Sequence, residues 1–276
     1  MKTNNTSPII ESNVQLSYSS GLYRFFTMTC ARLFAIVMAF FASMAGTDPE
    51  TMKPAVFTGL VNCIWVVNHM ARKLEGISSI SSSVHDNCFC KARMMLQDCI
   101  CMYCYAYNQQ AYQTGLKEHN IINGLVLRNV LIPVKAFKKL VIVFPYLRIE
   151  SFGDVANVTQ ARNYIRIIKA FPEKRCAIWS KNIAIYEQAF KLEGKPRNTT
   201  YVHSSRALNQ PDNIDLNRYD FVDHIFTVYT KRYIKKHNVI INCGGKKCLE
   251  CIKQRKNCYF RLNDRNNTLY INEEKK

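Results

Sequence analysis

Strand-like segments alternate with helical sequence from about residue 77 onward, and this alternation constrains the fold more than any other feature. The segments are short, rich in β-branched and aromatic residues, and bounded by turn-forming sequence. Strands separated by helices form right-handed βαβ units, so we expect an α/β fold, either an incomplete parallel (β/α)6-like barrel or an open parallel sheet. The predicted strands are residues 146–151, 175–180, 200–205, 223–230 and 238–243, with a weaker one at 76–83.

The helices between these strands carry their own start and stop signals. A helix is expected over residues 158–170, where Asn157 can cap the first turn and Gln160 stands at the third helical position. Another is expected over 183–193, with Asn182 as a plausible cap and Gly194 and Pro196 as a stop signal. Further helical sequence spans 105–140, with breaks expected near Gly124 and Pro133.

The N-terminal part of the chain differs in composition from the rest. We predict a disordered tail at 1–20, a helical N-terminal cap at 21–76 with apolar stretches at 23–45 and 56–74, an α/β metal-binding domain at 77–262, and a basic, polar tail at 263–276. The apolar run 33–44 is short for a membrane span and late for a signal peptide. A buried helix is therefore favoured over a signal, an anchor or an ill-defined extension. We expect no stable membrane insertion and a cytoplasmic protein.

Twelve cysteines are present, and nine of them fall into two clusters. Without export the compartment is reducing, so clustered thiols indicate metal ligands before disulfides. Four thiolates fit either a tetrahedral zinc site or a four-iron cluster, and the sequence does not separate the two. The first cluster has one thiol more than such a site needs. The predicted metal ligands are Cys88, Cys90, Cys99, Cys101 and Cys104 in the first cluster and Cys243, Cys248, Cys251 and Cys258 in the second.

Polar residues follow the predicted strands, where a parallel sheet places its active edge. Glu150, Ser151 and Asp154 follow one strand and Lys181 follows the next, so we take these four as candidate catalytic residues. Asp154 could equally be a turn residue and Lys181 a solvated loop lysine. The first cysteine cluster follows the first strand and the second follows the last, which predicts that both reach one face of the molecule. His203, inside a strand, is expected to be structural.

Positive charge is concentrated near the C-terminus. The chain has 38 Lys and Arg against 20 Asp and Glu, a formal net charge of +18. Residues 230–276 hold thirteen of the cations and four of the acids, which gives half of the excess, +9. This region could bind the phosphate backbone of a nucleic acid, or it could be a solvated basic tail.

Several motifs in one order resemble the "gene product eighty-eight" family of phages and mobile elements over about residues 77–262. They include the segments CYAYNQQAYQTGLKEHNIINGL, YLRIESFGDVANVTQARNYIRIIKAFP, VDHIFTVYTKRYI and INCGGKKCLEC. The family is itself of undefined biochemical function. The resemblance implies a protein of a phage or mobile element.

The coarse layout is also distantly similar to radical S-adenosylmethionine enzymes, in which a partial parallel barrel carries a three-cysteine iron–sulfur loop after its first strand. Their loop is usually Cys-x3-Cys-x2-Cys before an aromatic residue. Here Cys101-x2-Cys104-Tyr105 matches and the first half, Cys99-x-Cys101, does not. This resemblance implies one or two iron–sulfur clusters, S-adenosylmethionine as a further cofactor, and Glu150 as a contact to that cofactor.

Two functions follow as expectations. The first is an iron–sulfur protein doing redox or radical-type chemistry on a nucleic acid or nucleotide. The alternative is a non-catalytic nucleic-acid-binding protein whose cysteines hold structural zinc.

Overall fold

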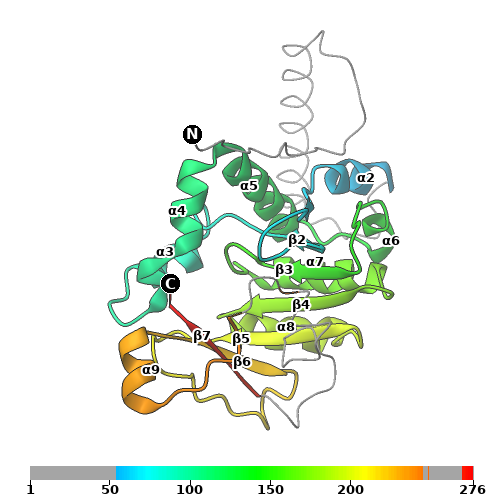
Figure 1. Cartoon of the computed structure of the whole chain (residues 1–276). Coiled ribbons are helices and arrows are strands. Elements are labelled where there is room, and N and C mark those ends of the chain that lie inside the picture. The colour runs from blue at the N-terminus through cyan, green and yellow to red at the C-terminus, as the bar shows by residue number, and fades with distance from the viewer. Residues whose placement is uncertain (1–53, 245–247, 249–268, 276) are drawn as a thin grey trace.

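The computed structural model describes residues 54–244, 248 and 269–275 (Figure 1). The strands are β1 (Val67–Asn68), β2 (Ile77–Ile80), β3 (Tyr146–Ile149), β4 (Arg175–Ser180), β5 (Thr199–Ser204), β6 (His224–Tyr229) and β7 (Tyr270–Glu274). The helices are α2 (Pro54–Asn62), α3 (Cys88–Met94), the 3₁₀ helix η1 (Ile100–Tyr103), α4 (Tyr105–Tyr112), α5 (Thr114–Asn129), α6 (Val134–Phe137), α7 (Val158–Ala170), α8 (Ile183–Glu193) and α9 (Lys231–His237).

The strands form one sheet in sequence order, β1 to β7, and every pair from β2 onward is parallel. Because each right-handed crossover moves in the same direction along the sheet, the crossover helices gather on one face. Figure 1 shows α7 and α8 behind the strands. The α/β class and the parallel sheet are thus confirmed. The sheet is open, since among the described residues no ladder joins β7 to β1.

The helix-covered face of the sheet holds the main core. The apolar stripe of α7 supplies Ile165 and Ile168, both fully buried, against Leu147 and Ile149 of β3. Burial of each such side chain stabilises the fold by about 1.5–3 kcal/mol. As expected, Asn157 caps this helix by accepting a hydrogen bond from the Gln160 backbone N–H at 2.9 Å.

We call the other face of the sheet the inner face. The sheet curls around this face until its two edges approach each other. A smaller apolar cluster that includes Ile77 of β2 and Ile271 of β7 covers part of it. Lys73, just before β2, pairs with Glu273 of β7 at 2.5 Å. The backbone N–H of Cys248 donates to the Lys73 carbonyl at 2.9 Å. Contacts from the C-terminal part of the chain therefore link the first strands to the last.

The last strand is not where the sequence placed it. Residues 238–243 form no strand apart from an isolated bridge between Cys243 and Glu273, and β7 lies instead in the segment 263–276, which was expected to be a tail. Asn238 ends α9 in the left-handed conformation. Asn242 then binds β7 through its side chain, which donates to the Tyr270 carbonyl and accepts from the Asn272 N–H. The backbone N–H groups of Asn242 and Cys243 both donate to the Asn272 carbonyl, so the segment contacts β7 without forming a regular ladder.

Two helix predictions also needed correction. The stretch 56–74 is helical only to Asn62, after which Val67–Asn68 pairs with β2 as an antiparallel edge strand. In the 105–140 region the break expected near Pro133 is confirmed, since α5 ends at Asn129 and α6 begins at Val134, but the other break lies at Gln113 and α5 continues through Gly124. Gly124 sits close to Ser82 at the end of β2, so a small residue is useful there for packing.

Several predictions fall on residues that the structure does not describe: the tail 1–20, the stretch 23–45, Cys251 and Cys258. Within the described ranges, no helix is long and apolar enough to cross a membrane.

Candidate functional site

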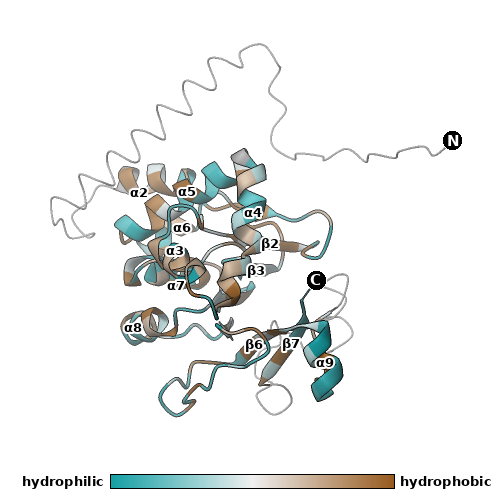
Figure 2. Ribbon diagram, turned by 90° about the vertical axis from the view of Figure 1, so that its left-hand side faces the viewer, coloured by the Kyte–Doolittle hydropathy of each residue, from teal (hydrophilic) through white to brown (hydrophobic). Residues whose placement is uncertain are grey.

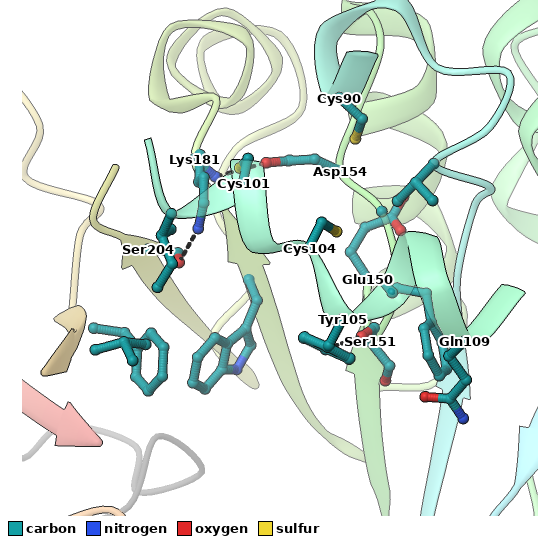
Figure 3. A pocket seen from close by; sticks show the side chains of 18 of the residues that line it. Cys90, Cys101, Cys104, Tyr105, Gln109, Glu150, Ser151, Asp154, Lys181 and Ser204 are labelled. Atoms are coloured by element: carbon teal, nitrogen blue, oxygen red, sulfur yellow. Dashed lines mark hydrogen bonds between the residues drawn. The ribbon is translucent and has the colours of Figure 1, made fainter. Parts of the chain in front are cut away.

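A cavity of about 790 Å³ lies at the C-terminal edge of the sheet. All four candidate catalytic residues, Glu150, Ser151, Asp154 and Lys181, line it (Figure 3). Its wall also includes residues of α3, η1, α4 and β7. The expectation that polar residues after successive strands come together is therefore confirmed.

Three thiols of the first cysteine cluster reach this cavity. Cys90 comes from α3, Cys101 from η1 and Cys104 from the residue between η1 and α4. Figure 3 shows their side chains gathered near Asp154 and Lys181. Residues three apart eclipse each other in a 3₁₀ turn, and the Cys104 N–H bonds to the Cys101 carbonyl at 3.1 Å. The Cys-x2-Cys spacing therefore projects two thiols to one side.

Asn87 fixes the third thiol. Its Oδ1 accepts from the backbone N–H groups of Phe89 and Cys90 and caps α3. Its Nδ2 donates to the Asp154 carbonyl at 2.5 Å. One side chain thus orients Cys90 and joins α3 to the loop after β3.

The remaining cysteines are placed differently. Cys88 is exposed on α3. Cys99 is buried, and its backbone forms an isolated antiparallel β-bridge with Ala207. Cys243, from the second cluster, lines the same cavity, while Cys248 is buried beside Lys73. Of the second cluster, Cys243 therefore lines the cavity that three thiols of the first cluster reach, while Cys251 and Cys258 lie outside the described residues.

Burial favours the protonated form of three cavity thiols, Cys90, Cys101 and Cys243. Burial raises the pKa of Cys101 to about 12, and the Lys181 ammonium opposes the rise. Burial, with Asp154 and Glu150 nearby, also raises the pKa of Cys90 far above its usual value. The pKa of Cys243 rises to about 11, mainly through burial. A metal must therefore displace protons from these thiols to bind.

The Glu150 carboxylate is tied into the fold by four donors. Its Oε2 accepts from the Ser82 N–H at 3.0 Å. Its Oε1 accepts from the Ser82 hydroxyl at 2.7 Å, the Tyr164 hydroxyl at 2.6 Å and the Gln160 amide at 3.2 Å. Burial raises the pKa of Glu150 to about 8, and the Ser82 and Tyr164 donors oppose the rise. The Glu150 side chain thus joins the end of β2 to α7. The backbone of Glu150 itself has a φ of 58°.

Asp154 is held in the same way. Its carboxylate accepts from the Ser180 hydroxyl at 2.5 Å, the Lys181 N–H at 2.7 Å and its neighbour Val155 N–H at 2.8 Å. Burial raises its pKa against these donors. Asp154 thus joins the loop after β3 to the end of β4, so it is more than a turn residue.

The serines of the weak strand at 76–83 explain how these loops are held. Ser81 Oγ accepts from the backbone N–H groups of Ser151 and Phe152 at 3.0 and 3.2 Å. Ser82 binds Glu150 as above. Serine is a poor strand former, and here the buried hydroxyls supply the acceptors and donors that the post-β3 loop needs.

Sequence reasoning missed a basic and aromatic wall of the cavity. The Arg148 guanidinium lies 4.5 Å from the Trp179 ring centroid, and the Phe226 ring meets Trp179 edge-on, also at 4.5 Å. All three line the cavity. The available signal was a charged residue in the middle of an otherwise apolar strand, TyrLeuArgIle, because alternate strand residues face opposite sides.

Two further polar groups have defined partners. Lys181 Nζ donates to the Ser204 hydroxyl across the cavity at 2.5 Å. His203 is buried, and its Nε2 pairs with Asp212 Oδ2 at 2.9 Å, which holds the loop after β5 and supports the expected structural role.

Comparison with known proteins finds no match, since no protein-family model, no curated protein and no solved structure matches the chain. The resemblance to the phage family stays a prediction from the sequence motifs.

Proposed function

We propose that this chain is an iron–sulfur protein whose working cluster is held by Cys90, Cys101 and Cys104, and that it carries out redox or radical-type chemistry on a nucleic acid or nucleotide. The observation that carries this proposal is the convergence of three thiols on one cavity at the active edge of a parallel sheet. The sequence favours Cys99, Cys101 and Cys104 for this cluster, and the proposal puts Cys90 in place of Cys99, which is buried and does not line the cavity.

Thiolates are the ligands that iron–sulfur clusters use, and zinc sites use them as well. Within the described ranges, no group of three or more Cys, His, Asp or Glu side chains is arranged to hold a metal ion. Lys181, whose charge lowers the pKa of Cys101, would offset the charge of bound thiolates.

When bound, such a cluster supplies one-electron chemistry that no side chain can supply alone. The chain's own residues hold and orient what enters the cavity. Lys181 and Ser204 form a polar contact on one side, and Arg148 with Trp179 forms a cationic aromatic wall on another. S-adenosylmethionine as a second cofactor rests on the distant resemblance and is part of the proposal only to that extent.

Anaerobic purification of the full chain, followed by iron, sulfide and zinc analysis, tests the site. Replacing Cys90, Cys101 or Cys104 with Ala should remove the iron of this cluster, while Cys88→Ala, a neighbouring exposed thiol, should keep it. A colourless protein with zinc and no labile sulfide would support the structural-zinc alternative. Equal iron loss in Cys88→Ala and Cys90→Ala would contradict the assigned ligands.

A further inference from the structure

The short helix α9 is a strongly basic surface. Its sequence, KRYIKKH, has no acidic residue. Lys231, Arg232, Lys235 and Lys236 are all exposed. None of the ion pairs among the described residues involves these four side chains. Figure 2 shows the helix as mostly hydrophilic and at the side of the molecule away from α7 and α8. Such a cluster is suited to phosphate groups.

Contacts of Lys275 link the end of β6, just before α9, to a residue that lines the cavity. α9 begins at Thr230, at the C-terminal end of β6 and thus at the same edge of the sheet as the cavity. The Lys275 N–H donates to the Tyr229 carbonyl at 2.7 Å, just before α9. The Lys275 ammonium lies 3.9 Å from the centroid of the Tyr103 ring. Tyr103 is 58% exposed and lines the cavity.

Charge and aromatic surface therefore run together from α9 to the cavity. Glu274, exposed beside Lys275, is an acid on this path, and the cations of α9 outnumber it. Lys275 covers one face of the Tyr103 ring, and the exposed remainder of the ring is a surface on which a base can stack, next to cations that can follow a phosphate backbone. Inside the cavity, Trp179 and Arg148 offer a second stacking surface.

The size of the cavity decides which form of nucleic acid fits. A volume of about 790 Å³ is within the range of small-ligand sites, so it accepts a nucleotide and not a duplex. A base must leave its stack to enter such a pocket, which is easiest from a single strand.

We infer that the chain binds single-stranded nucleic acid along α9, Lys275 and Tyr103, with one nucleotide entering the cavity, so that its substrate is a polymer and not a free nucleotide. This inference rests on the proposed function of the same cavity and names its substrate class.

Fluorescence anisotropy with a labelled single-stranded oligonucleotide and the full chain tests the inference. The variant Lys231→Gln/Lys235→Gln/Lys236→Gln removes three charges from α9. The matched control, Lys135→Gln/Lys138→Gln/Lys139→Gln, removes three exposed charges at the end of α6, which precedes β3 and so lies at the opposite edge of the sheet. The α9 variant should bind about 10-fold or more weakly at low salt, with a salt slope about 2 smaller. The control should bind within about threefold of the wild type.

Tyr103→Ala should weaken binding at least about fivefold while leaving most of the salt slope intact, because it removes stacking and not charge. Equal losses in the two triple variants, tighter binding of a duplex than of the single strand, or competition by a free nucleotide as strong as that by the oligonucleotide would each overturn the inference. Iron is measured in the same samples. If an iron-free protein binds the single strand through α9, the binding surface is supported and the iron–sulfur cluster is contradicted. If an iron-loaded chain does not bind the single strand, the cluster is supported and the binding surface is contradicted.

Discussion

The four-donor arrangement around Glu150 leads to a prediction that two matched tyrosine variants can test. Tyr164 and Tyr186 are both fully buried, in the neighbouring helices α7 and α8. The Tyr164 hydroxyl donates to Glu150 at 2.6 Å, whereas the Tyr186 hydroxyl has no hydrogen-bond partner among the described residues. Replacing each with Phe keeps the ring and removes only the hydroxyl.

The expected magnitude depends on the charge of Glu150. Its folded pKa of about 8 lies above the usual value of 4.5, so below pH 8 the Tyr164 hydroxyl donates to a largely neutral acid. Loss of such a bond costs about 0.5–1.5 kcal/mol, and loss of a bond to the ionised carboxylate costs about 1.5–3 kcal/mol. The destabilisation by Tyr164→Phe should therefore grow as pH rises through about 8. Tyr186→Phe should leave stability unchanged or raise it by up to about 1 kcal/mol, because it removes an unsatisfied buried hydroxyl.

Urea unfolding of the two variants and the wild type, at about pH 6 and about pH 9, measures both effects. The wild type itself should lose the contribution of neutral Glu150 as pH rises through 8, since the folded state binds this proton more tightly than the unfolded chain does. Equal destabilisation by Tyr164→Phe and Tyr186→Phe, or a Tyr164→Phe loss that does not change with pH, would refute the assignment of Glu150 as the acceptor that ties β2 to α7.

Three further predictions concern the supports of the site. Gly153→Ala should cost about 2 kcal/mol or more in urea unfolding, because φ is +82° and a Cβ would lie 2.6 Å from the Ser82 carbonyl, whereas Gly115→Ala on open helix surface should be neutral or stabilising. Asn87→Ala and Asn157→Ala should each cost about 1 kcal/mol by removing a helix cap, but only Asn87→Ala should also lower iron content, since Asn87 orients Cys90. Burial and the nearby Arg148 lower the pKa of His69 to about 4, so at this site the unfolded chain binds more protons between about pH 4 and 6.5. The contribution of His69 to stability should rise with pH across that window, so the difference in unfolding free energy between the wild type and His69→Gln should grow there.

The parts of the fold that local sequence determines were predictable. The five segments from 76–83 to 223–230 are strands of the sheet within a few residues of their predicted ends, and α7 and α8 have the expected bounds. These elements have clear periodicity and turn-forming flanks. The last strand was missed because YINEE, with two acids and an Asn, has no apolar alternation, and it becomes a strand only by pairing with β6 along its length.

The position of the site in the fold was predictable from the sequence, but the role of each residue in it was not. The rule that chemistry collects at the C-terminal edge of parallel strands placed Glu150, Asp154 and Lys181 correctly around one cavity. Which of five thiols reach it depends on the 3₁₀ turn of η1 and on the cap by Asn87, and no spacing rule in the sequence fixes either.

The hydrogen bonding of the two carboxylates changes what the cavity is suited to bind. Glu150 and Asp154 were expected to contact substrate, yet both direct their oxygens to donors of the protein, and burial raises both pKa values. They act as positioning residues that hold the ends of β2 and β4, while Lys181 and Arg148 present cationic groups on the cavity wall. A site whose carboxylates are bonded within the protein and whose wall carries these two half-buried cations favours an anionic ligand. The sheet order also carries the thiols, the basic wall and α9 to one edge of the sheet, where the cations add attraction for an anionic ligand.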